Sequence, residues 1–180
     1  MRSPSDEVLY KDKWIELRKK DDWYTYAHNV VGDGVAVLGF RRTPSGIPGV
    51  CIWEVMVRSE HTPPHGEGFR LTSLTGSIEH GLSPLETAAK ELKEESGYEI
   101  NSDSIIDLGW VYPSKFSDYR QYLYAVDLTG LPQGRIEGDG TEGEKGASVG
   151  WFSVDFALEV NDPSISASIA RLANKGRNIL

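Results

Sequence analysis

The stretch LTGSIEHGLSPLETAAKELKEESGYEI, residues 74–100, decides the fold. It predicts a strand end, a loop punctuated by glycine, one helix and a second loop. Ser83 suits the N-cap of this helix, Pro84 suits its first position, and Glu86 completes a Ser-x-x-Glu capping box. Gly97 supplies a left-handed stop, so the sequence predicts a helix that ends just before it.

The helix has an apolar stripe and an acidic face. The stripe consists of Leu85, Ala88, Ala89 and Leu92. Glu91, Glu94 and Glu95 share the other face, where like charges at this spacing repel by roughly a few tenths of a kcal/mol per pair. Carboxylate oxygens are the ligands that Mg²⁺ or Mn²⁺ prefers, so a metal site is one interpretation. The other is a solvated acidic face with Lys90 and Lys93 as neighbours.

The spacing of Gly76 and of residues 90–98 resembles the Nudix box, Gly-x5-Glu-x7-Arg-Glu-U-x-Glu-Glu-x-Gly-U, where U is a bulky aliphatic or aromatic residue. Two positions depart from it. Leu82 and Lys90 stand where the family has a Glu and an Arg that form a structural salt bridge. We expect Lys90 to pair instead with Glu86, one turn earlier on the helix.

Composition sets the class of protein. With 180 residues, 39% of them hydrophobic and 26% charged, the chain is expected to form one globular core. Its net charge of −8 argues against binding to nucleic acid backbones. No apolar segment is long enough for a membrane span or a signal peptide. The single cysteine, Cys51, is expected to be a buried structural thiol in a strand, which fits a cytoplasmic protein without disulfides.

Residues 1–32 form an N-terminal extension. Partly alternating runs at 9–20 and 23–31 predict an antiparallel pair of strands. Such an extension is similar to that of the ADP-ribose pyrophosphatase branch of the Nudix family, where it contributes to a homodimer and to the adenine pocket. Trp23 and Tyr26 are therefore candidate stacking residues, unless they pack between strands or subunits.

Residues 35–42 and 50–58 predict a hairpin. The loop at 59–68 that follows, with its Pro-Pro, is similar to the Arg-x-x-Arg-Pro-Pro region of ADP-ribose pyrophosphatases. By that likeness Arg58 and Arg70 are candidates for binding a substrate phosphate, although either can be a surface charge.

The C-terminal half predicts three strands and two helices. The strands are expected at 104–111, 119–128 and 148–154, and the helices at 152–160 and 163–174. The connector before the second strand resembles a substrate loop of the ADP-ribose branch, which makes Phe116 a candidate contact. A long acidic loop precedes the last strand. In the family a Glu at that point binds metal or activates water, so Glu142 and Glu144 are candidates, with a mobile acidic tether as the alternative.

The resemblance implies an α/β fold in which residues 33–180 form a Nudix domain, a mixed sheet between helices. It implies Mg²⁺ or Mn²⁺ held by Glu91, Glu94, Glu95 and the carbonyl of Thr75, with Glu142 or Glu144 as the base. The expected reaction is hydrolysis of a nucleoside diphosphate linked to another moiety, with ADP-ribose as the leading substrate. The alternatives are another nucleotide sugar, a dinucleotide, a nucleoside triphosphate, or a sensor that binds a nucleotide without turnover.

Overall fold

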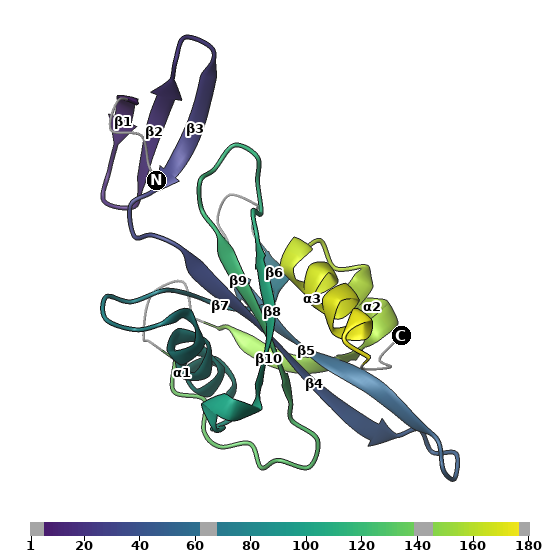
Figure 1. Ribbon diagram of the computed structural model, residues 1–180. Coiled ribbons are helices and arrows are strands. Elements are labelled where there is room, and N and C mark those ends of the chain that lie inside the picture. Colours follow the sequence, from purple (N-terminus) through teal and green to yellow (C-terminus); the bar gives the residue numbers. More distant parts are fainter. Residues whose placement is uncertain (1–5, 62–67, 139–145, 177–180) are drawn as a thin grey trace.

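The computed structural model describes residues 6–61, 68–138 and 146–176. They form a central mixed sheet between helices and a separate three-stranded N-terminal sheet (Figure 1). The strands are β1 (Glu7–Lys11), β2 (Ile15–Lys20), β3 (Tyr24–Asn29), β4 (Gly34–Pro44), β5 (Cys51–His61), β6 (Phe69–Thr72), β7 (Leu74–Ser77), β8 (Ile105–Val111), β9 (Gln121–Asp127) and β10 (Ser148–Ser153). The helices are α1 (Pro84–Ser96), the 3-10 helix η2 (Ser102–Ser104), α2 (Val154–Leu158) and α3 (Pro163–Asn174). The α/β class and the N-terminal β extension expected from the sequence are confirmed.

The central sheet is organised around β4. Its strand order is β10-β5-β4-β9-β8, with β6 paired to β5 and β7 paired to β4. β4 is antiparallel to β5 and β7 and parallel to β9. The sequence predicted only a strand end near residue 74, whereas the structure has two short strands, β6 and β7, of four residues each. Because β7 leads into α1, its pairing with β4 places the start of the 78–83 loop beside the middle of the sheet.

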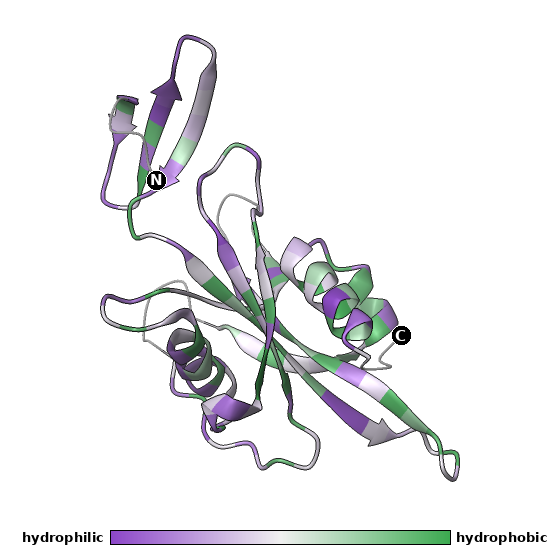
Figure 2. Ribbon diagram, in the orientation of Figure 1, coloured by the Kyte–Doolittle hydropathy of each residue, from purple (hydrophilic) through white to green (hydrophobic). Residues whose placement is uncertain are grey.

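Helices cover both faces of this sheet, with α1 on one side and α2 and α3 on the other (Figure 1). Alternation along β4 sends Val35 and Val37 toward α1, and Ala36 and Leu38 toward the opposite face. Figure 2 shows apolar residues concentrated in the central strands and on α3. The α1 face is closed by Ala88, Leu92, Met56, Leu74, Tyr124 and Val126, and the other by Phe40, Leu123, Ile165, Ile169 and Leu172.

The ends of α1 are those that the sequence predicts. The Ser83 hydroxyl accepts the N–H of Glu86 at 3.2 Å, and the Glu86 carboxylate accepts the N–H of Ser83 at 2.7 Å. Gly97 adopts the left-handed conformation, with φ 76°, and its N–H donates to the carbonyl of Lys93. Local side-chain to backbone bonds therefore fix both ends of the helix that carries the acidic face.

The N-terminal sheet has three strands rather than the expected two. The carboxylate of Asp12 accepts the N–H groups of Trp14 and Ile15, at 2.7 and 2.8 Å, which turns the chain inside the run taken as one strand. The buried face of this sheet is polar and includes Glu16 and His28. Several apolar residues of the sheet, among them Leu17, are exposed.

Two other expectations were wrong. Cys51 is exposed rather than buried, because it lies at the outer end of the long β4–β5 hairpin, where α2 and α3 do not cover the sheet. The helix expected at 152–160 is the shorter α2, because β10 continues to Ser153, whose hydroxyl then caps α2. Within the described residues, no helix has the length and apolar character needed to cross a membrane.

Candidate active site

The three carboxylates of α1 lie at different depths beside β7. Glu95 is buried, while Glu91 and Glu94 are half-buried. The register of β7 with β4 places Thr75 opposite Ala36 and Gly76 opposite Val35, next to these carboxylates. The helix caps and the strand pairing therefore bring the acidic face of α1 to the backbone of β7.

Glu95 is held by a cation and by the main chain. Its Oε1 forms an ion pair with the guanidinium of Arg58, and both side chains are buried. Its Oε2 accepts the N–H of Thr75 at 3.0 Å. Arg58 also lies 3.6 Å from Glu60, two residues along β5. The carboxylate of Glu95 is thus compensated by protein groups, as a buried charge requires.

Lys90 connects α1 to the loop that precedes it. Its Nζ lies 2.9 Å from Glu79 and 2.7 Å from Glu94, so the expected pair with Glu86 was wrong. Glu86 is engaged in the capping box instead, which leaves Lys90 to the loop. Hydrogen bonds to Glu94 and Glu79 raise the pKa of Lys90 above its ordinary value. Glu79 therefore supplies the loop carboxylate that the chain lacks at Leu82.

Glu91 packs against bare backbone. A Cβ added at Gly76 would overlap the carboxyl group of Glu91, so this close approach requires a glycine. Burial raises the pKa of Glu91 from 4.5 to about 7, and this effect outweighs the opposing charge of Lys90. The charged form of Glu91 would therefore be stabilised by an added cation.

The donor set fits a hard divalent cation by its chemistry. Carboxylate oxygens and a backbone carbonyl at Thr75 are the ligands that Mg²⁺ and Mn²⁺ prefer. In the described part of the chain, no three His, Cys, Asp or Glu side chains converge closely enough to hold a metal ion. Arg58 and Lys90 each form an ion pair with one carboxylate of α1, Glu95 and Glu94 respectively.

The loop after β9 approaches the C-terminal end of α1. The N–H groups of Glu137 and Gly138 donate to the carbonyl of Glu94, at 3.2 and 3.0 Å. The two candidate bases, Glu142 and Glu144, lie outside the described residues. The chain therefore reaches the acidic end of α1 four residues before Glu142.

The other candidate residues are dispersed. Arg70 donates to the carbonyl of Asn161 at 2.9 Å and lines a cavity of about 270 Å³ with Phe156, on the α2 side of the sheet. Trp23 is 80% exposed, and Phe116 is exposed in the β8–β9 connection. The Tyr26 hydroxyl donates to Asp6 at 2.6 Å.

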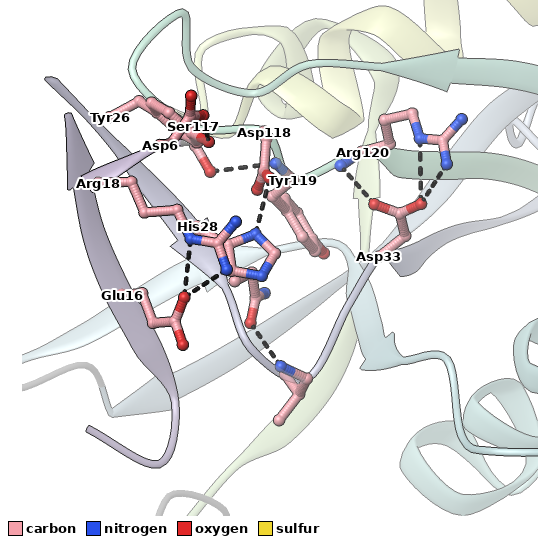
Figure 3. A network of polar contacts seen from close by, with 12 residues as sticks. Asp6, Glu16, Arg18, Tyr26, His28, Asp33, Ser117, Asp118, Tyr119 and Arg120 are labelled. Atoms are coloured by element: carbon pink, nitrogen blue, oxygen red, sulfur yellow. Dashed lines mark hydrogen bonds and ion pairs between the residues drawn. The ribbon is translucent and has the colours of Figure 1, made fainter. Parts of the chain in front are cut away.

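Contacts that sequence reasoning missed attach the N-terminal sheet to the β8–β9 connection (Figure 3). His28 of β3 lies 2.7 Å from Asp118, and the backbone of Ala27 bonds to Phe116 and Asp118. The Tyr24 hydroxyl donates to the carbonyl of Lys115. These contacts join segments about 90 residues apart, for which the sequence contains no local signal.

Arg120 is fixed in the same region (Figure 3). Its guanidinium donates to the carboxylate of Asp33 through Nε at 3.0 Å and Nη2 at 2.7 Å. Asp33 precedes β4 and Arg120 precedes β9, so this pair joins the starts of the two parallel strands.

Comparison with known proteins identifies the family. The NUDIX domain model matches residues 34–172, which covers the central sheet, α1, α2 and most of α3. No curated protein matches the chain. Nudix domains are hydrolases that act on pyrophosphates of nucleoside diphosphate derivatives and generally use divalent metal ions. The capped acidic helix lies on β7, and the NUDIX domain model matches most of the chain. The chain therefore belongs to the Nudix family.

Proposed function

We propose that this Nudix hydrolase cleaves the pyrophosphate bond of ADP-ribose to give AMP and ribose 5-phosphate. The observation that carries the proposal is the seating of the α1 carboxylates on β7, with Glu91 against Gly76 and Glu95 on the N–H of Thr75. Two segments of this chain resemble segments of ADP-ribose pyrophosphatases. This resemblance favours ADP-ribose over other nucleotide sugars, dinucleotides and nucleoside triphosphates. These are the N-terminal extension, residues 1–32, and the Pro-Pro loop that precedes β6 in the domain of residues 33–180.

In this proposal Glu91, Glu94, Glu95 and the Thr75 carbonyl hold Mg²⁺ or Mn²⁺. A bound divalent ion supplies charge stabilisation for the phosphoryl oxygens and acidifies water. Arg58 lies beside Glu95 and can pass from this carboxylate to a substrate phosphate, since a guanidinium binds either anion in a bidentate way.

The base is proposed to be Glu144 or Glu142. The hydrogen bonds from Glu137 and Gly138 to the carbonyl of Glu94 support this role, because they bring the loop to α1 shortly before these residues. A carboxylate at that point would take the proton of the attacking water.

Substrate contacts are proposed for Arg58, Arg70, Phe116, Trp23 and Tyr26. Arg70 lies on the α2 side, so its contribution requires a substrate or loop that extends around β6. Phe116 belongs to the connection that binds β3, which makes this junction a natural place for one end of the substrate.

A homodimer is proposed through the N-terminal sheet. Tyr10, Leu17 and Ala27 are register partners across its three strands, and the first two are exposed apolar residues. A second copy would cover this face. A cytoplasmic location remains a proposal, made from the single cysteine.

A sensor that binds a nucleotide without turnover is the second candidate. It is favoured by the ion pairs of Arg58 with Glu95 and Lys90 with Glu94, which compensate two α1 carboxylates by protein cations alone. Leu82 adds to it, because the family has a Glu at that position.

The experiment measures the release of AMP from ADP-ribose in the presence and in the absence of Mg²⁺. The enzyme hypothesis expects Mg²⁺-dependent release that Glu95→Gln abolishes. Glu99→Gln, a change of the same kind at a carboxylate that is 77% exposed, is expected to leave the rate intact. A panel of nucleotide sugars, dinucleotides and triphosphates assigns the substrate. If the protein binds a nucleotide tightly but hydrolyses no member of the panel, the enzyme hypothesis is rejected in favour of the sensor hypothesis.

A further inference from the structure

A row of four register partners crosses the central sheet from α1 to its β8 edge. Trp110 of β8 pairs with Tyr122 of β9, Tyr122 with Val35 of β4, and Val35 with Gly76 of β7. Directly paired residues in a sheet point their side chains to the same face. Val35 and Tyr122 pack in the α1 cluster, and Gly76 faces Glu91. Trp110 therefore lies on the face that carries the α1 carboxylates.

A bulge in β8 places Trp110 on this face. Leu108 packs in the cluster under α2 and α3, so simple alternation would send Trp110 to that face as well. The register shifts between Asp107 and Trp110, and Gly109 has φ 80°, which a residue with a side chain adopts with strain. Bulges of this kind commonly redirect a side chain next to an active site.

Trp110 belongs to an aromatic group with one cation, which we name the aromatic platform: Trp110, Tyr112, Tyr122 and Arg120. The rings of Trp110 and Tyr112 lie 5.0 Å apart, nearly perpendicular. The guanidinium carbon of Arg120 lies 5.8 Å from the rings of both Trp110 and Tyr122, and Asp33 fixes its position. Trp110 is 43% exposed and Tyr112 is 56% exposed, so ring surface remains open to a ligand.

The spacing matches a nucleotide. Trp110 is three strands from Gly76, which is about 14 Å at roughly 4.8 Å per strand. An extended nucleoside diphosphate spans a distance of this order between its base and its far phosphate. A nucleotide with its pyrophosphate at the α1 carboxylates would therefore be long enough for its base to meet the exposed rings. Aromatic faces stack any nucleobase, and a guanidinium adds cation–π attraction.

We propose that the aromatic platform binds the nucleobase of the substrate by stacking, with Trp110 as the main contact. This inference rests on the proposed function, because it takes the pyrophosphate position from it. It assigns the base to the β8–β9 face of the Nudix domain, at a site separate from Trp23 and Tyr26 of the N-terminal sheet. Arg120 acts as a positioning residue through its contact with the Trp110 ring.

The test compares Trp110→Leu with Ile52→Ala. Ile52 is 45% exposed, which matches Trp110, and it lies in the outer part of the β4–β5 hairpin, opposite Thr43. Affinity of the Mg²⁺-loaded full chain for ADP and for inorganic pyrophosphate is measured by calorimetry, and KM and kcat are measured with ADP-ribose. Two controls show whether the variants fold. Trp110→Phe keeps an aromatic ring at this position, and circular dichroism reports the folding of each variant.

Trp110→Leu is expected to weaken ADP binding and raise KM by roughly 5- to 100-fold while pyrophosphate binding and kcat stay near wild type. Trp110→Phe should recover most of the affinity, and Ile52→Ala should leave the affinity for both ligands unchanged. Unchanged ADP binding in Trp110→Leu overturns the platform, as does an equal loss for ADP and pyrophosphate. If the wild type binds neither ligand, the proposed function fails with it. If the wild type hydrolyses ADP-ribose and Trp110→Leu keeps the wild-type KM, the platform alone is wrong.

Discussion

Replacing Glu91 by Gln tests whether burial of the Glu91 carboxyl group beside Gly76 disfavours its charged form. Glu91 has a pKa of about 7 in the folded chain against an ordinary value of 4.5, so folding favours its protonated form. Below about pH 4.5 the side chain is protonated in both states and folding carries no penalty. Between about pH 4.5 and about 7 the unfolded chain releases this proton while the folded chain retains it, so stability falls over this range and stays low above about pH 7, where both states are charged.

The size of this loss follows from the two pKa values. At about 1.4 kcal/mol per pH unit, the difference between 4.5 and about 7 corresponds to roughly 3 kcal/mol. Glu91 keeps some contact with water, so we expect about 2 kcal/mol. Glu91→Gln should therefore stabilise the metal-free protein by about 2 kcal/mol at about pH 8, or about 4–8 °C in Tm, and by under about 1 kcal/mol at about pH 5.

The assay is urea unfolding in EDTA, followed by circular dichroism at both pH values. Glu99→Gln is the matched control, since this carboxylate is exposed and its ion pair with Lys93 lies at the surface, where such a pair contributes little. Saturating Mg²⁺ should shrink the advantage of Glu91→Gln, because a bound cation offsets the penalty. Equal stability of Glu91→Gln and wild type at both pH values would refute the argument that burial at Gly76 acts on this carboxylate.

Three other substitutions test the contacts of the site. Arg58→Met leaves a buried α1 carboxylate without its cation and should cost about 3–5 kcal/mol in EDTA; an unchanged urea midpoint would show that this pair is not formed in solution. Gly76→Ala places a methyl group in the space of the Glu91 carboxyl, so AMP release in the proposed reaction should fall at least about tenfold with the far-UV spectrum unchanged, and retained activity would contradict this packing. Glu79→Gln removes the loop partner of Lys90 and should lower stability by about 0.5 kcal/mol, a difference that about 1 M NaCl should abolish.

Local chemistry explains what could be predicted from the sequence. The caps of α1 depend on bonds between residues three or four apart, so Ser83, Glu86 and Gly97 were sufficient to locate its ends. The spacing of Glu91, Glu94 and Glu95 was also sufficient to place three carboxylates on one side of that helix, because residues three and four apart share a helix face. The turn at Asp12 was missed although it is local, because an alternating run concealed it.

The partners of those carboxylates were decided by the tertiary structure. Arg58 reaches Glu95 because β5, β4 and β7 align next to α1, and Lys90 turns to Glu79 because the capping box engages Glu86. Each of these contacts depends on where distant strands meet.

The sequence by itself therefore determined the helix, its acidic face and the family pattern, since these depend on neighbours within one or two turns. The tertiary structure decided which charges compensate that face, and which aromatic residues share its side of the sheet. A single bulge at Gly109 reverses the side on which Trp110 lies, and the strand register brings Trp110 into line with Gly76 across four strands. Register is a property of paired strands, so it is fixed when the sheet assembles and cannot be read from any one of them.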